Sequence, residues 1–330
     1  MIIRIGGISV NLLVRENAAG PRTDRIMEGL RERLSHFIVR GDRHDFSLVI
    51  RPADDLPWAE ILGRDDLMRV RRIARILEGR FPFGKILFDD GHKKGQKVDQ
   101  SSMNRKMVLP ILSRFDGGAV SVIPRRGLLL AVDHTTGHGE VVVKGTDEQA
   151  LIPSLVNALQ GVLALCAPDH GALMLHASSL AFDGGGYLFL GGSGAGKSTI
   201  AASVPPETAL SDDGSWCRRD DGAFFLFPTP FSQINPGPAS TVRAPLMRAL
   251  FLEKSGRNYV AELSRGRAMT MLLLNHIHFF RFMYREGALR AFGLVGDLCR
   301  THPFSTLFFS RNFNPIPFFR ETADERKEAV

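Results

Sequence analysis

Short apolar runs alternate with amphipathic stretches over the first 90 residues of the chain. The runs have the length of strands, and the longer stretches between them repeat apolar residues at the spacing of a helix. This pattern predicts a small α+β unit. Its apolar runs are residues 2–14, 46–50 and 85–90, and its amphipathic stretches are residues 25–39 and 66–79.

The next segment, residues 91–105, is polar and basic and shows neither the helical nor the strand period. Such composition is typical of a linker or surface loop. We therefore predict an N-terminal α+β domain at residues 1–105, able to bind substrate or a partner, and a second domain at residues 106–330.

Strand patterns dominate the beginning of the second domain. Three β-rich runs separated by turn residues predict an antiparallel meander. A long apolar-periodic stretch at residues 147–167 predicts a helix, capped by Asp147 and ended before Pro168. Strand, tight turn and strand follow. The meander covers residues 119–124, 127–133 and 140–145, and the hairpin covers residues 172–192.

Further apolar runs at residues 224–231, 249–253 and 306–310 predict strands, and residues 260–283 show a mostly helical pattern. Because strands and helices are interspersed, we expect a mixed α/β fold, with a mixed sheet and helices around it.

A glycine-rich loop follows the hairpin directly. Its sequence fits the pattern of a phosphate-binding loop, with a strand before it and a helical run after it, as that motif requires. Glycines let backbone N–H groups turn toward an anion, the lysine neutralises phosphate charge, and the next hydroxyl suits Mg²⁺. The predicted ATP site is Gly191, Gly192, Ser193, Gly194, Ala195, Gly196, Lys197, Ser198 and Thr199.

Two carboxylates and one histidine flank this loop in the sequence. Asp212 and Asp213 end a short apolar run soon after the loop, and His176 lies one hairpin before it. Adjacent carboxylates near Mg-ATP can divide two tasks, metal binding and proton removal from an attacking hydroxyl. An ordinary Asp-Asp-Gly turn and a core histidine are the structural alternatives.

In this order and at these short intervals, the three elements resemble the catalytic domain of the HPr serine kinase/phosphatase family, which shares its nucleotide site with phosphoenolpyruvate carboxykinases. The resemblance implies an HPr-kinase-like P-loop domain. It also implies Asp212 as general base, Asp213 as its metal-binding neighbour, and His176 as a support for the reacting phosphate and acid. With Lys197 of the loop, these give the predicted catalytic residues Asp212, His176 and Lys197, and the predicted metal ligands are Ser198, Asp212 and Asp213. Residues 256–258, Gly-Arg-Asn, resemble a family segment that opens a late helix.

The chain departs from that family where a Glu-containing segment is expected, because residues 228–237 read PTPFSQINPG. It is therefore closer to the divergent HPr-kinase-related proteins of peptide-maturation cassettes, including the SynChlorMet type. This resemblance implies an ATP- and Mg²⁺-dependent kinase that phosphorylates a Ser or Thr hydroxyl of a peptide or protein, or a small metabolite. The alternatives are a nucleotide-dependent peptide-binding module without turnover and an ATPase that drives a partner.

Composition excludes few classes of binding partner. A formal charge of +7 favours acidic partners. The basic stretches at residues 69–80 and 92–97 lack the interleaved aromatics that stack on bases, so nucleic acid is not expected. The three cysteines form no metal motif and predict reduced thiols. We expect a cytoplasmic protein without signal peptide or membrane span, and homo-oligomerisation stays open.

Overall fold

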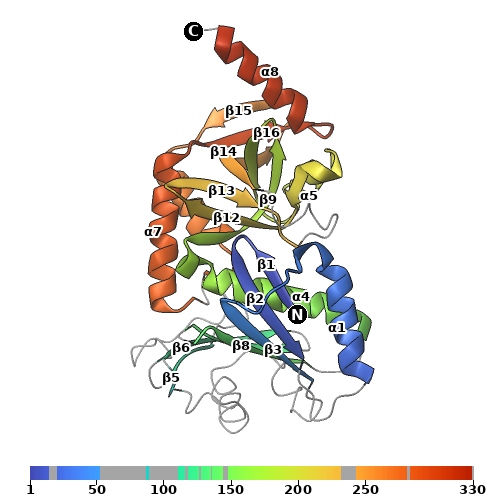
Figure 1. Ribbon diagram of the computed structural model, residues 1–330. Coiled ribbons are helices and arrows are strands. Elements are labelled where there is room, and N and C mark those ends of the chain that lie inside the picture. Colours follow the sequence, from blue (N-terminus) through green and yellow to red (C-terminus); the bar gives the residue numbers. More distant parts are fainter. Residues whose placement is uncertain are drawn as a thin grey trace, which may run out of the picture.

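The protein is a mixed α/β structure built on two mixed sheets, which confirms the expected fold class at this level. Figure 1 shows the computed structural model, with a long helix between the two sheets. The structure describes residues 1–14, 21–52, 87–88, 111–115, 118–125, 128–134, 136–143, 148–231, 243–280 and 283–328.

The first sheet has the strand order β1-β2-β3-β8-β7-β6-β5-β4. The strands β5 to β8 run antiparallel to one another, which confirms the predicted meander, whereas β3 pairs in parallel with both β2 and β8. The strands are β1 (Ile2–Ile5), β2 (Ile8–Val14), β3 (Phe46–Pro52), β4 (Leu87–Phe88), β5 (Ile111–Phe115), β6 (Gly118–Arg125), β7 (Leu128–Asp133) and β8 (His138–Val143), and the helix α1 (Pro21–Arg33) follows β2.

This sheet takes strands from both sides of residue 105, the predicted domain boundary. β3 precedes that residue, and its parallel neighbour β8 follows it. The division at residue 105 itself stays a prediction. The predicted linker at residues 91–105, the amphipathic stretch at residues 66–79 and the basic stretches at residues 69–80 and 92–97 lie outside the described residues.

The second sheet has the order β10-β9-β12-β13-β14-β16-β15, with β11 also on β9 and β10 also beside β14. β10, β14 and β16 are parallel to one another. The expected strands at residues 172–182, 249–253 and 306–310 are present, whereas the one expected at residues 224–231 ends at Phe227, because two prolines follow. The strands are β9 (Ala172–Phe182), β10 (Gly185–Leu190), β11 (Ala209–Ser211), β12 (Gly214–Asp220), β13 (Ala223–Phe227), β14 (Ala244–Lys254), β15 (Tyr259–Glu262) and β16 (Phe304–Phe309).

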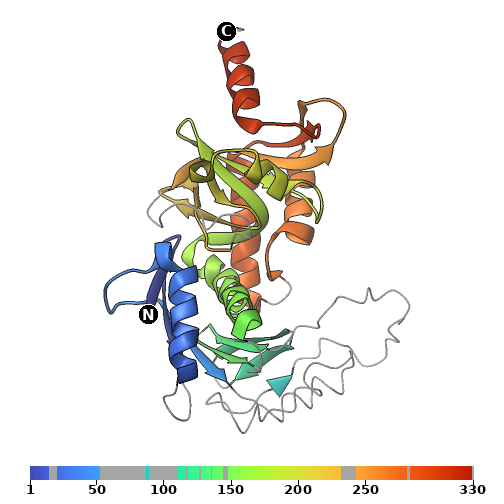
Figure 2. The ribbon, with the colours of Figure 1, turned by 90° about the vertical axis from the view of Figure 1, so that its right-hand side faces the viewer.

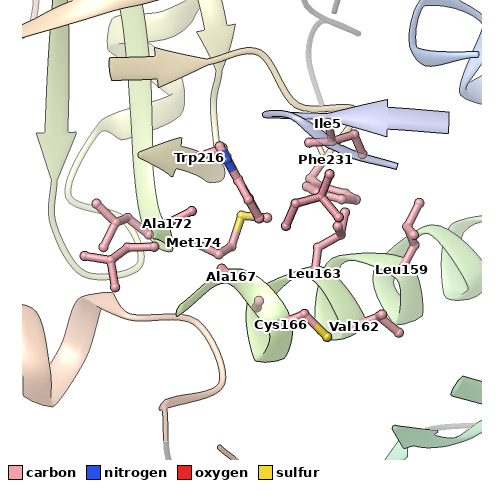
Figure 3. Close-up of a cluster of buried hydrophobic side chains, with 14 of the residues drawn as sticks. Ile5, Leu159, Val162, Leu163, Cys166, Ala167, Ala172, Met174, Trp216 and Phe231 are labelled. Atoms are coloured by element: carbon pink, nitrogen blue, oxygen red, sulfur yellow. The ribbon is translucent and has the colours of Figure 1, made fainter. Parts of the chain in front are cut away.

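The predicted helix at residues 147–167 is α4 (Glu148–Cys166), and it lies between the two sheets (Figure 2). Its leucines and valines pack against side chains of both sheets, among them Ile5 of β1 and Trp216 of β12 (Figure 3). By length and composition alone, Leu151–His170 is apolar enough to cross a membrane. The expectation that no such stretch exists was therefore wrong. Most of this stretch is buried inside the protein, as in the core helix of a soluble domain.

The β1–β2 turn connects the first sheet to the second. Gly6 and Gly7 form this turn with φ angles of 56° and 90°, a region that favours glycine. A Cβ atom on Gly6 would collide with the indole ring of Trp216. The guanidinium of Arg218, on the same strand β12, donates a 2.9 Å hydrogen bond to the carbonyl oxygen of Gly6. The N-terminal hairpin thus docks on the strand that follows the acid pair.

The helical prediction for residues 260–283 was only partly correct. Its beginning belongs to β15, because an apolar alternation pairs this stretch with β16. Ser264 then caps α6 (Arg265–Met271), which continues into one π turn at Leu272–His276. Ile277 bridges to Leu175 at the edge of β9. The other α-helices in the described part of the chain are α5 (Lys197–Ala202), α7 (Arg285–Thr301) and α8 (Pro315–Glu328).

Candidate functional site

His176 lies where three predicted elements meet. On one side of β9, Leu190 at the end of β10 pairs with Ala177, so the glycine loop begins beside the histidine. On the other side, Gly214 at the start of β12 pairs with His176 itself, so Asp213 arrives next to it. The hairpin and the short return from α5 therefore bring together the histidine, the loop and the acid pair, as the sequence predicted.

The glycine loop joins β10 to α5 with the conformation that its glycines permit. Gly194 and Gly196 have φ angles of 77° and 108°. A Cβ on Gly196 would come within 2.7 Å of the Phe309 ring, whereas one on Gly192 would meet open space. Ser193, Ser198 and Thr199 are exposed, so their hydroxyls are accessible to a ligand. The loop is therefore packed against Phe309 on one side and exposed to solvent on the other.

Lys197 is held inside the loop. Its side chain is almost fully buried, and Nζ donates hydrogen bonds of 2.8 Å to the carbonyl oxygen of Gly191 and 3.1 Å to that of Gly192. Nζ also lies 3.2 Å from Nε2 of His176. Burial lowers the pKa of Lys197, and the nearby Asp213 carboxylate opposes that fall. The ammonium is therefore positioned at the loop, and no carboxylate in the described part of the chain pairs with it directly.

His176 connects this lysine to Asp213. Its Nδ1 lies 3.1 Å from Oδ1 of Asp213. If the ammonium donates to Nε2, the ring proton of a neutral imidazole sits on Nδ1, facing the carboxylate. This contact with His176 is the main cause that lowers the pKa of Asp213, and His278 and Lys197 act in the same direction. Asp213 is therefore ionised at neutral pH.

The two carboxylates of the acid pair have different surroundings. The Asp213 side chain is 34% exposed, whereas Asp212 is only 2% exposed. Asp213 is thus the carboxylate that contacts His176 and reaches solvent near the loop. Asp212, the base implied by the family resemblance, lies in the interior beside β11.

Two further histidines, which the sequence analysis did not single out, surround His176. Nδ1 of His276 lies 3.3 Å from the main-chain carbonyl oxygen of His176, and the rings of His278 and His176 meet edge to face at 5.2 Å. Nε2 of His278 is 3.4 Å from the main-chain carbonyl oxygen of Asp213. The sequence feature that could have identified these two histidines is the alternation His-Ile-His at residues 276–278, a pattern typical of an extended segment. The helical interpretation of residues 260–283 concealed it.

The other two predicted segments support the site from outside. Thr229, in the segment at residues 228–237, donates a 2.7 Å hydrogen bond to the carbonyl oxygen of Gly214 and is fully buried. Gly-Arg-Asn at residues 256–258 joins β14 to β15 and opens no helix, contrary to the resemblance. Oδ1 of Asn258 accepts a 2.7 Å hydrogen bond from the backbone N–H of Ser310, at the end of β16.

A magnesium site at Ser198, Asp212 and Asp213 stays a prediction. The described part of the chain contains no cluster of three His, Cys, Asp or Glu side chains that could hold a metal. Mg²⁺ does not require such a cluster, because it commonly keeps several waters and binds one or two carboxylates together with substrate phosphates. An exposed hydroxyl and an ionised carboxylate near the loop suit that mode of binding.

Comparison with known proteins agrees with the sequence resemblance. Residues 141–286 match the family model described as SynChlorMet cassette protein ScmC. No curated protein matches the chain. The Hpr(Ser) kinase/phosphatase from Coxiella burnetii is similar in structure, at 11% identity and a TM-score of 0.26, over 47% of this chain and 96% of that one. The region from residue 141 to residue 286, which contains the whole candidate site, is thus similar to the ScmC family of SynChlorMet cassette proteins.

Proposed function

We propose that this site transfers the γ-phosphoryl group of ATP to a hydroxyl group, on a Ser or Thr of a peptide or protein or on a small metabolite. The observation that carries the proposal is the contact chain Lys197–His176–Asp213 at the start of a phosphate-binding loop. It joins a cation suited to phosphate charge, an ionised carboxylate suited to a proton, and a histidine between them.

In the proposed reaction the acceptor oxygen attacks the γ-phosphorus, a new P–O bond forms, and the bond to the ADP oxygen breaks. The hydroxyl proton passes to a carboxylate of the acid pair. Lys197 is held by the loop carbonyls, so a bound phosphate would compete with those carbonyls for its ammonium. Mg²⁺, held through Ser198 and the acid pair, would neutralise charge on the phosphates.

We assign the proton-accepting role to Asp213, because this carboxylate is partly exposed and contacts His176. Asp212 would support the metal or the loop from inside the protein. This assignment reverses the roles that the family resemblance implies. The reason is the difference in exposure. Asp212 is only 2% exposed, so its carboxylate cannot reach a hydroxyl on an incoming peptide without a rearrangement.

The experiment is a label-transfer assay with the purified full chain, Mg²⁺ and γ-labelled ATP, alone and with the peptides encoded beside its gene, followed by mass spectrometry. We expect a mass increase of one phosphoryl group on a Ser or Thr of one peptide. Tight ATP binding without transfer to any acceptor would instead support the peptide-binding module. Multiple turnover with water as the acceptor would support the ATPase.

A further inference from the structure

A polar cavity lies at the opposite end of the parallel strands from the phosphate loop. Its volume is about 470 Å³. Arg248 of β14 and Ser305 of β16 contribute to its floor, and Glu262 ends β15 at its border. Arg265, the first residue of α6, and Arg300, near the end of α7, complete its polar lining. Five elements, from β14 to β16, thus contribute to one cavity.

The lining carries more positive than negative charge. Among the described residues, the lining contains three guanidinium groups and one carboxylate, that of Glu262. Burial lowers the pKa of His302, the lining histidine, so this side chain adds no charge at neutral pH. Arg300 also pairs with Asp297 at 3.1 Å, but its side chain stays 63% exposed. The cavity therefore attracts anions, and arginine can bind a carboxylate through two parallel hydrogen bonds.

The position of the cavity favours an extended chain as its ligand. β15 is the edge strand of the second sheet, next to β16 (Figure 1), and no described strand pairs with its outer side. Unpaired edge strands accept extended peptides through backbone hydrogen bonds. An acidic side chain on such a peptide would reach the arginines where β15 ends, since Val260, Glu262 and Leu263 line the cavity.

We propose that this cavity, defined by Arg248, Arg265 and Arg300, is a docking site for an acidic segment of a peptide. Carboxylate side chains of the peptide enter the cavity while its backbone lies along β15. The site is separate from the phosphate loop and binds whether or not the loop transfers phosphate.

The test is a binding titration of the full chain with a fluorescein-labelled peptide containing six glutamates, and with the same peptide in which glutamines replace them. We expect the glutamate peptide to bind more tightly, and the difference to shrink at high salt because the charges are exposed. The double variant Arg265→Ala, Arg300→Ala should weaken binding about tenfold, at roughly 1.4 kcal/mol per factor of ten.

The matched control is Arg267→Ala with Arg285→Ala. It removes the same charge from the same two helices, but neither residue lines the cavity. Arg219 keeps its 2.6 Å contact with Asp297 in the test variant, so the loss of Arg300 leaves that carboxylate paired. Glu262→Gln should tighten binding severalfold, since Glu262 is the one acidic side chain among the described lining residues.

Equal weakening by both double variants would mean that net charge alone attracts the peptide, and it would overturn the proposal. Equal binding of the glutamate and glutamine peptides, or no binding of either, would also overturn it. Direct binding of inorganic phosphate to the chain, with no binding of the glutamate peptide, would also overturn the proposal and assign the cavity to a small anion.

Discussion

The two ends of the parallel strands β10, β14 and β16 carry different kinds of polar site. At the carboxyl ends, Lys197 is 6% exposed and is held by two carbonyl oxygens and a histidine. At the amino ends, Arg300 is 63% exposed and has only one neighbouring carboxylate among its described contacts. Side chains fixed by several contacts suit chemistry that needs exact geometry, whereas solvated arginines suit attraction of a charged partner.

The largest expected effect tests the carboxyl-end site. Asp213→Asn should lower phosphoryl transfer by about 10²–10⁴-fold, the usual contribution of a general base. ATP affinity should be unchanged or higher, because a negative charge near the phosphates is lost. Single-turnover transfer and ATP titration measure the two quantities separately.

Asp212→Asn is the matched control for that prediction, because it makes the same chemical change one residue away. We expect a smaller loss of transfer, with a change in Mg²⁺ dependence. A larger loss from Asp212→Asn than from Asp213→Asn would restore the roles implied by the family resemblance and contradict our assignment.

The next effect tests whether the loop is rigidly packed. Gly196→Ala places a side chain at a φ angle of 108° and within 2.7 Å of the Phe309 ring. We expect the free energy of unfolding to fall by about 2–3 kcal/mol, from backbone strain and overpacking together. Denaturant unfolding measures the loss.

Gly192→Ala provides the comparison within the same loop, since a Cβ there would meet open space. Its cost should be about 0.5 kcal/mol, as for ordinary surface substitutions. If both variants lost the same stability, the loop would not be packed against Phe309 as the structure indicates.

A third effect concerns His276, which is buried next to the main chain of His176. Burial is the largest cause that lowers the pKa of His276, to about 4. The unfolded chain therefore binds a proton between pH 6.5 and 4 that the folded protein excludes, so this stability is complete above pH 6.5 and is lost as the pH falls toward 4. The contribution is on the order of 1–2 kcal/mol, because part of the shift is offset by relaxation and solvent.

His276→Gln should make the stability–pH profile flatter between pH 6.5 and 4. Some slope should remain, because the pKa of His134 is also lowered to about 4, chiefly by burial. His36→Gln, the same substitution at an exposed position, is the matched control for the loss of a histidine. An unchanged slope in His276→Gln would show that water reaches this histidine.

The sequence could predict the carboxyl-end site because its parts are close together in the chain. His176, the loop and Asp213 all lie within residues 176–213, where one hairpin and one short helix leave few possible arrangements. The glycine pattern of the loop also predicted phosphate binding as the chemistry of the site. The sequence could not show which of the two adjacent aspartates is buried. Their exposure depends on how β11 and β12, on either side of the acid pair, pair with β9.

The remaining features depend on contacts between distant segments. His276 and His278 reach the site only because a π turn ends α6 and an extended segment then pairs with β9, which an apolar periodicity does not reveal. The arginine cavity has no local motif at all. The single sheet formed by β3 and β8 likewise joins residues on both sides of a segment whose composition is typical of a linker.

The smallest expected effect is the independence of the two sites. The double variant Arg265→Ala, Arg300→Ala should change ATP affinity by less than about twofold, since distant sites without shared contacts act additively. The phosphate loop begins four residues beyond Tyr187, which pairs with Arg248, so about 13 Å of strand separates the loop from the cavity floor. ATP titration of the variant measures this. A clear loss of ATP affinity would mean that the arginines attract the nucleotide as well. The phosphate loop and the arginine cavity would then not be separate sites.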